Sequence, residues 1–199
     1  MDTKLIRLVR EDDVREILDI YAPYVKNTSI TFECTTPSLK DFNKKVSKVT
    51  SFYPFLVCEV NNSVIGYAYA DRIREREAYD WDVELSIYLN QNYSNLGIGK
   101  ILYEALLDIL KLQNIYNAYG VITLPNKASV KLHKKLGFKE IGVFHNTGFK
   151  FNKWYDVIWF EKTIQSLQTP PDKIKPFSAI DKNKVTQIIS NYNKILNSI

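Results

Sequence analysis

The residue whose setting most suggests chemistry is Glu84, because it lies within the largely apolar segment 81–89. This segment alternates from residue 83 onward, which predicts a strand with apolar residues on one face and Glu84, Ser86 and Tyr88 on the other. Burying a carboxylate there is costly unless it is paired or used. Glu84 is therefore either bonded to a nearby arginine or tyrosine or held ready as an acid or base, and the residues alone leave both interpretations open.

A second candidate is the segment Ser94–Lys100, S-N-L-G-I-G-K, which precedes an amphipathic stretch. Glycines at the start of a helix let main-chain amides approach an anion, and the helix N-terminus favours negative charge. The segment completes neither the G-x-G-x-x-G nor the G-x-x-x-x-G-K-[ST] pattern, which disfavours NAD and ATP. By itself it fits a pyrophosphate cradle and an ordinary helix start about equally well.

The third candidate is His133, which lies on a predicted helix between Leu132 and Lys134. Asn126 is placed to cap the start of this helix, and Gly137 is placed to end it. A lone histidine in such a position is more often structural than catalytic. The structural interpretation is therefore the preferred one from the residues alone.

Hydrophobic periodicity predicts the elements that must position these groups. Strands are expected at 4–10, 55–60, 64–70, 81–89, 118–123, 138–145 and 154–163. Four helices are expected in this part of the chain. The first begins at residue 14, and the second follows a Thr36 N-cap and has Pro37 in its first turn. The third begins at the Gly97-Ile98-Gly99 segment, and the fourth follows Asn126. The turn-forming cluster 61–63 predicts an antiparallel hairpin. This order indicates an α/β (α+β) fold, a mixed sheet with helices on its faces.

Proline residues divide the end of the chain from this predicted domain of residues 1–164. Pro170, Pro171 and Pro176 mark an extended linker over 165–178. Residues 179–199 then carry an apolar stripe at helical spacing, which predicts an added C-terminal helix. Such a helix can dock on the domain or on a second subunit.

Composition narrows the class of protein. The chain has 199 residues, 45% of them hydrophobic, and a net charge of +5, which indicates one globular domain. Residues 165–199 hold five lysines and two aspartates, net +3, so only +2 remains for the rest and no nucleic-acid footprint is predicted. Cys34 and Cys58 lack metal or disulfide spacing, and we expect both to be reduced thiols in the core, with no metal bound. No signal peptide or membrane-spanning run is recognised, so a cytosolic protein is expected.

Several segments in order resemble the GNAT superfamily of N-acetyltransferases over residues 4–163, and more narrowly the phosphinothricin acetyltransferase family. They are Ala78–Trp81, Leu124–Asn126, Ser129–Val130, His133–Phe138, Gly148–Lys150 and Trp154–Val157. The resemblance implies a GNAT fold with a mixed, mostly antiparallel sheet and acetyl-CoA as the cosubstrate. The final helix is an addition to the family pattern.

The resemblance also implies which residues bind the cosubstrate. The pantetheine arm would lie along Ile87, Tyr88 and Leu89. The pyrophosphate would be held by Ser94, Asn95, Leu96, Gly97, Ile98, Gly99 and Lys100. Asn126 and Ser129 would contact the same molecule. Ser94 departs from the family pattern, which usually has Gln or Arg there, so main-chain amides and Lys100 would have to suffice.

The implied chemistry is direct attack of a free amine on the thioester, with a backbone amide holding the oxyanion and no covalent enzyme intermediate. Glu84 would deprotonate the amine, and His133 would either protonate the leaving thiolate or assist that deprotonation. Tyr88 would orient the substrate from the same strand.

The resemblance assigns the anionic group of a glutamate-like substrate to Arg76 and Tyr79, with Arg74 assisting, although solvated charges are the alternative for the arginines. A homodimer is expected. The competing functions are an acetyltransferase for polyamines or protein N-termini and a noncatalytic acyl-CoA-binding module.

Overall fold

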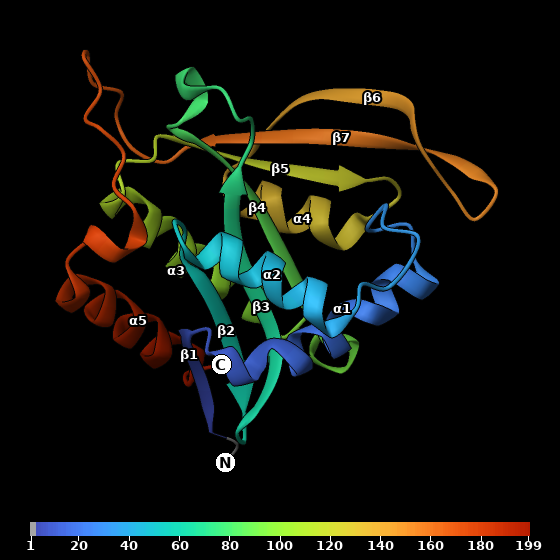
Figure 1. The fold of residues 1–199 in the computed structure, drawn as a ribbon, viewed down its shortest axis with the longest axis horizontal. Coiled ribbons are helices and arrows are strands. Elements are labelled where there is room, and N and C mark those ends of the chain that lie inside the picture. Colours follow the sequence, from blue (N-terminus) through green and yellow to red (C-terminus); the bar gives the residue numbers. More distant parts are fainter. Residues whose placement is uncertain (1–2) are drawn as a thin grey trace.

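Seven strands form a single sheet in the computed structural model, which describes residues 3–199 (Figure 1). The strands are β1 (Lys4–Leu8), β2 (Phe55–Val60), β3 (Ser63–Arg72), β4 (Asp82–Leu89), β5 (Asn117–Thr123), β6 (Lys139–Lys150) and β7 (Lys153–Thr163). Their order is β1-β2-β3-β4-β5-β7-β6, and only the β4–β5 pair is parallel. The prediction of a mixed, mostly antiparallel sheet is confirmed.

The helices cover both faces of this sheet. They are α1 (Val14–Asn27), α2 (Leu39–Thr50), α3 (Ile98–Leu112), α4 (Lys127–Lys135) and α5 (Lys182–Leu196). The residues of β4 show which helix lies on which face. Tyr88 lines a small cavity with residues of α1 and α2, whereas Ile87 and Leu89 lie against Gly99 of α3. The alternation predicted for this strand therefore separates an α1–α2 face, which carries Glu84, from an α3 face.

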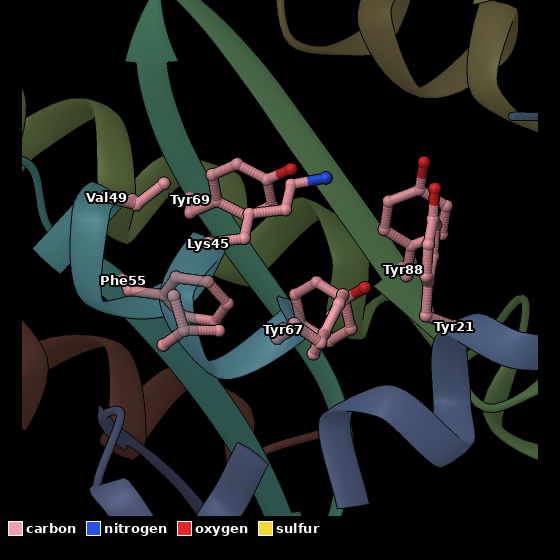
Figure 2. Close-up of a pocket in the computed structure, with 9 residues that line it drawn as sticks. Tyr21, Lys45, Val49, Phe55, Tyr67, Tyr69 and Tyr88 are labelled. Carbon is pink, nitrogen blue, oxygen red and sulfur yellow. The ribbon is translucent and has the colours of Figure 1, made fainter. Parts of the chain in front are cut away.

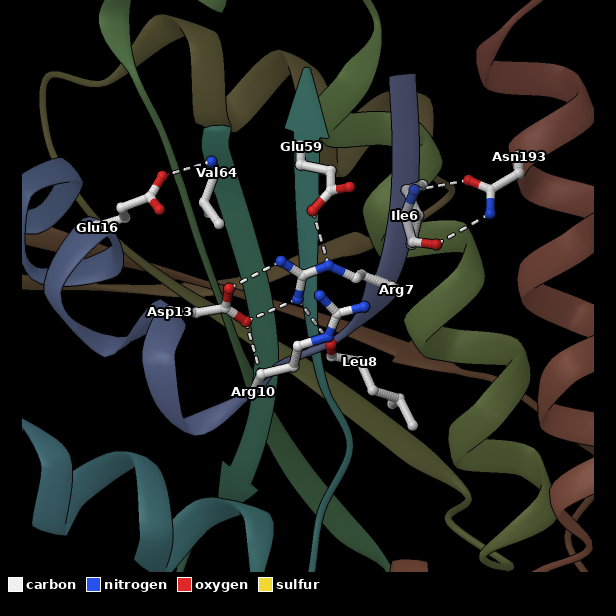
Figure 3. Close-up of polar contacts among 9 residues, drawn as sticks. All are labelled: Ile6, Arg7, Leu8, Arg10, Asp13, Glu16, Glu59, Val64 and Asn193. Atoms are coloured by element: carbon white, nitrogen blue, oxygen red, sulfur yellow. Dashed lines mark hydrogen bonds and ion pairs between the residues drawn. The ribbon is translucent and has the colours of Figure 1, made fainter. Parts of the chain in front are cut away.

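The C-terminal helix α5 docks within the same chain, on α3 and on the edge strand β1 (Figure 1). Asn193 bonds both main-chain groups of Ile6, accepting from its N–H at 2.6 Å and donating to its carbonyl at 2.9 Å (Figure 3). The side-chain amide of Asn197 donates to the carbonyl of Lys4. Because exposed edge strands invite pairing with other chains, this helix protects the edge while it packs on the core.

The segment 165–178, predicted as a linker, runs along the body of the protein. Its main chain accepts a bond from the Trp81 indole at Asp172 and donates one from Lys175 to Gln113. The Gln113 side chain, which is fully buried, donates to the carbonyls of Phe52 and Lys175. These bonds fix the path by which the chain reaches α5.

Two local predictions are wrong. Thr36 does not cap α2, because Ser38 is the N-cap, its hydroxyl accepting from Asp41 N at 3.2 Å, so Pro37 lies before the helix. Cys34 is exposed on the loop before α2, and only Cys58 is a core thiol. Because Cys34 lies on a loop, its side chain does not pack into the core.

Two strand boundaries also differ from the prediction. β1 ends at Leu8, because the chain turns into α1 where the Asp13 carboxylate accepts bonds from the Arg7 guanidinium and from Arg10 N (Figure 3). β6 continues to Lys150 instead of ending near residue 145. Its register shifts between Phe144 and Gly148, and this bulge interrupts the alternation that marks a strand.

None of the helices within residues 3–199 combines the length and the apolar character needed to cross a bilayer.

Candidate active site

The candidate site is a cleft that opens where β4 and β5 separate. The two strands pair only from Asp82 opposite Asn117 to Glu84 opposite Tyr119, and beyond that point they diverge. A cleft of about 560 Å³ lies there, lined by β4, β5, α3, α4 and the loop before α2. Glu84 is thus the last residue of β4 that pairs with β5, at the point where the cleft begins.

The diverging part of β4 presents main-chain groups to the cleft. Asn90 N donates to Ile65 O on the β3 side, so by alternation the N–H and C=O groups of Ile87 and Leu89 point toward the opposite edge, which β5 has left. The Leu89 carbonyl already accepts a bond from the Tyr24 hydroxyl at 2.6 Å. The Leu89 N–H and the main chain of Ile87 are thereby placed to bond an extended ligand.

The glycine segment at the N-terminus of α3 has a backbone conformation that favours anion binding, and it is called the glycine cradle below. Asn95 and Gly97 both have positive φ, 64° and 81°, a conformation in which successive N–H groups converge. Gly97 is the N-cap, so the first amides of α3 lack helical partners. A Cβ on Gly99 would lie 3.3 Å from Ile87, so the helix start lies close against β4. The Lys100 ammonium is paired with Glu104 at 2.7 Å.

Glu84 lines this cleft, and its carboxylate makes no hydrogen bond or ion pair with any residue within the described range 3–199. Burial, helped by the negative charge of Asp71, raises the pKa of Glu84, while the positive charges of Arg74 and Lys45 oppose the rise. The structural interpretation, a glutamate bonded to an arginine or tyrosine, therefore lacks its partner. An unpaired carboxylate with a raised pKa is suited to accept a proton.

His133 is 2% exposed and packs among aromatic rings, stacking on Phe160 at 5.6 Å between ring centroids. Its Nδ1 lies 2.9 Å from the Ser129 carbonyl, which requires a proton on Nδ1. Its Nε2 has no hydrogen-bond partner among residues 3–199 and lies against Gly120, where a Cβ would be only 2.3 Å away. Burial lowers the pKa of His133, so the ring is neutral at neutral pH with a free lone pair on Nε2.

Tyr103, one turn after Gly99 on α3, is a cleft residue that the sequence reasoning missed. It is 1% exposed, and burial together with the negative charge of Glu84 raises the pKa of its phenol. Its ring meets His133 edge to face at 5.5 Å. The i, i+4 spacing from Gly99 was the available signal, because it places Tyr103 on the face of α3 that carries the glycine segment.

Most of the predicted site residues line the cleft. They are Glu84, Ile87, Tyr88, Leu89, Ser94, Asn95, Gly97, Gly99, Lys100, Asn126, Ser129 and His133. Leu96 and Ile98 are outside the lining, the first 55% exposed and the second buried. Arg74, Arg76 and Tyr79 lie on the exposed segment between β3 and β4 and are also outside it, although the charge of Arg74 reaches Glu84.

Helix α4 forms the remaining wall of the cleft. The Asn126 side chain accepts from Ser129 N at 3.1 Å, which confirms the predicted cap, and Gly137 ends the helix with φ of 79°. Lys131 and Lys135 add cationic groups along this wall that sequence reasoning did not single out. Free main-chain amides, a glycine cradle and nearby lysines fit a long ligand that carries phosphates. No cluster of His, Cys, Asp and Glu that could hold a metal ion occurs within residues 3–199.

Comparisons with known proteins agree with this geometry. The family described as "Acetyltransferase (GNAT) domain" matches residues 6–159. The phosphinothricin N-acetyltransferase of Streptomyces viridochromogenes is 32% identical over 175 residues, which are 88% of this chain and 95% of that protein. The L-methionine sulfoximine/L-methionine sulfone acetyltransferase of Pseudomonas aeruginosa is 29% identical over 163 residues, 80% of this chain and 94% of that one.

Solved structures give the same result. The phosphinothricin acetyltransferase of Sinorhizobium meliloti, determined in complex with acetyl-CoA, superposes with a TM-score of 0.81 at 32% identity, covering 91% of this chain and 97% of that one. An acetyltransferase from Salmonella typhimurium with its cofactor acetyl-CoA has a TM-score of 0.80 at 26% identity, covering 85% and 98%.

The chain therefore belongs to the GNAT acetyltransferases. It is an acetyl-CoA-dependent N-acetyltransferase of the phosphinothricin and methionine sulfoximine acetyltransferase type. The predicted family, fold and cosubstrate are confirmed.

Proposed function

We propose that this enzyme acetylates the α-amine of a small, anionic amino-acid-like substrate, such as phosphinothricin or methionine sulfoximine, by direct attack of the amine on acetyl-CoA. The observation that carries the proposal is the unpaired Glu84 carboxylate at the point where β4 leaves β5. The names of the relatives support the substrate class.

Glu84 removes the proton from the incoming amine. An alkyl ammonium is mostly protonated at neutral pH, so a base must take its proton directly or through a water before the nitrogen can attack. Ionised Glu84 lies in the cleft, and no cation within residues 3–199 is bonded to it, so both of its oxygens are free to accept. Acetyl-CoA supplies the activated acetyl group, and no residue of the protein has to carry it covalently.

Two further groups stabilise the negative charges that develop during the reaction. A main-chain N–H on the diverging part of β4 bonds the oxyanion, and the Tyr103 phenol, which its raised pKa keeps protonated, donates toward the departing thiolate. The one proton of neutral His133 is donated from Nδ1 to the Ser129 carbonyl, so the ring cannot protonate the thiolate. We therefore assign His133 the other role, in which it assists deprotonation of the amine. Its ring also supports Tyr103 through the edge-to-face contact.

The substrate anion is assigned to the segment between β3 and β4. Arg74 and Arg76 carry exposed guanidinium groups there, and Tyr79 is 42% exposed nearby. A guanidinium binds a carboxylate or phosphinate through two parallel bonds. The positive charge of Arg74 favours ionised Glu84, which supports placing this anion site near the end of the cleft where the acceptor binds.

An acetyl-CoA consumption screen tests the proposal. Phosphinothricin, methionine sulfoximine and standard amino acids should be acetylated, and spermidine and an alanyl peptide should not. The Arg76→Ala variant should raise the acceptor KM about tenfold, because a charge-assisted bond to the acceptor is lost. Turnover confined to the polyamine or the peptide, with Arg76→Ala equal to wild type, would contradict it.

We also propose that the enzyme is a homodimer that acts in the cytoplasm, where acetyl-CoA is available. The hairpin β6–β7 extends beyond α4 to the right of Figure 1. It exposes between 52% and 56% of each of four aromatic residues, Phe144, Phe149, Phe151 and Trp154. Such a surface suits a second copy of the chain. A monomeric mass in solution would contradict this assignment.

A further inference from the structure

Lys45 on α2 is a cation outside the assigned site, and it lines the small cavity on the α1–α2 face of β4 together with Tyr88. Its neighbour Lys44 has a side chain 68% exposed and pairs with Asp41 on the helix surface. The Lys45 side chain is 43% exposed, and its ammonium lies over the Tyr21 ring, 5.6 Å from the centroid. Figure 2 shows it beside the Tyr69 hydroxyl and directed toward Tyr21 and Tyr88.

The sheet register relates Lys45 to Glu84. Tyr69 pairs with Ser86 across β3 and β4, so Tyr69, Ser86 and Glu84 lie on the same face of the sheet. Ser86 and Glu84 are two residues apart, which is about 7 Å along a strand. An α-amino acid whose amine lies at Glu84 can therefore direct its carboxylate toward the ammonium beside Tyr69. The favourable effect of the Lys45 charge on ionised Glu84 agrees with this separation.

The ammonium also has capacity for a ligand. The nearest carboxylate to Lys45 within residues 3–199 belongs to Glu33, at 3.6 Å, which is longer than a hydrogen bond. An ammonium has three donors, and here they face tyrosine hydroxyls and a cavity of about 10 Å³, room for about one water. The other side chains that line the cavity are aromatic or aliphatic, and no carboxylate is among them.

We propose that Lys45 binds the α-carboxylate of the acceptor, while the segment between β3 and β4 binds its side-chain phosphinate or sulfoximine group, and that Lys45 thereby selects amino acids over simple amines. The inference rests on the proposed function and adds a specificity residue to it. Lys45 acts on ground-state binding of the acceptor, so its loss should appear in KM and not in kcat.

The test compares Lys45→Met, which keeps the aliphatic stem, with Lys45→Arg, Glu33→Gln and the surface control Lys44→Met. The probes are L-methionine sulfoximine and its α-carboxamide, with thermal melts to verify folding. Lys45→Met should raise the KM for the acid about tenfold or more while barely changing that for the amide. Lys45→Arg, Glu33→Gln and Lys44→Met should stay near wild type with both probes.

The alternative role for Lys45 is to hold the loop before α2 through Glu33. In that case Glu33→Gln and Lys45→Met would raise KM alike, for acid and amide together, and the proposal would be overturned. A Lys45→Met variant equal to wild type toward the acid would overturn it as well, while leaving the proposed function intact. If wild type acetylated neither probe, the proposed function and this inference would fail together.

Discussion

The two walls of the cleft present different kinds of groups, main-chain groups on one side and side chains on the other. The cofactor wall, defined as the diverging part of β4, the segment 94–100 and the start of α4, presents mainly backbone: unpaired amides, a helix N-terminus and an asparagine cap. The acceptor wall, defined as residues 30–32 of the loop before α2, presents side chains of a segment that is held by a distant part of the chain, the Lys150 ammonium. A wall of backbone can serve many relatives, whereas a wall of side chains can change with the substrate.

Glu84 lies where the walls meet, and its replacement should have the largest effect. Glu84→Gln keeps the size of the side chain but removes the base, so kcat should fall about a hundredfold or more. Equilibrium binding of acetyl-CoA, measured by calorimetry, should stay unchanged because the cofactor wall is untouched. Unaltered turnover would remove Glu84 from its role.

The pH dependence sharpens the same assignment. The base must be ionised to act, and burial raises the pKa of Glu84 above its ordinary value of 4.5, so kcat/KM should fall as the pH drops through that raised value. Asp71 pairs with Glu84 across the strands, and its negative charge contributes to the rise. Asp71→Asn should therefore move the acidic limb of the kcat/KM profile to lower pH. A limb that stays in place or moves upward would contradict the assignment.

On the cofactor wall, Gly97→Ala should weaken acetyl-CoA alone. Gly97 has φ of 81°, where a side chain is strained by about 1–3 kcal/mol, and relief of that strain would disturb the amides of the cradle. The KM for acetyl-CoA should rise about tenfold or more, with little change for the acceptor. Gly142→Ala is the matched control, because a Cβ there meets nothing within 4 Å. A rise in both KM values would show that the walls are not independent.

The contrast between the walls also explains what the sequence could predict. The helix start at the glycine segment, the Asn126 cap and the alternation of β4 are local patterns, and the structure has all three. The acceptor wall depends on contacts between distant residues that no short pattern records. The buried ammonium of Lys150, for instance, donates to Thr31 O across 119 positions of the chain, and the β6 bulge that precedes it was also missed.

The smallest effect is expected from the acceptor wall, at a position outside the cleft. A Cβ on Gly148 of β6 would lie 2.0 Å from the end of the Phe32 ring, which lines the cleft. Because a ring edge can move more easily than backbone, Gly148→Ala should displace Phe32 at little cost in thermal stability. The acceptor KM should then change severalfold while the KM for acetyl-CoA stays constant. If the KM for acetyl-CoA shifted instead, Phe32 would belong to the cofactor wall. That wall would then include side chains as well as backbone, which would contradict the contrast between the two walls.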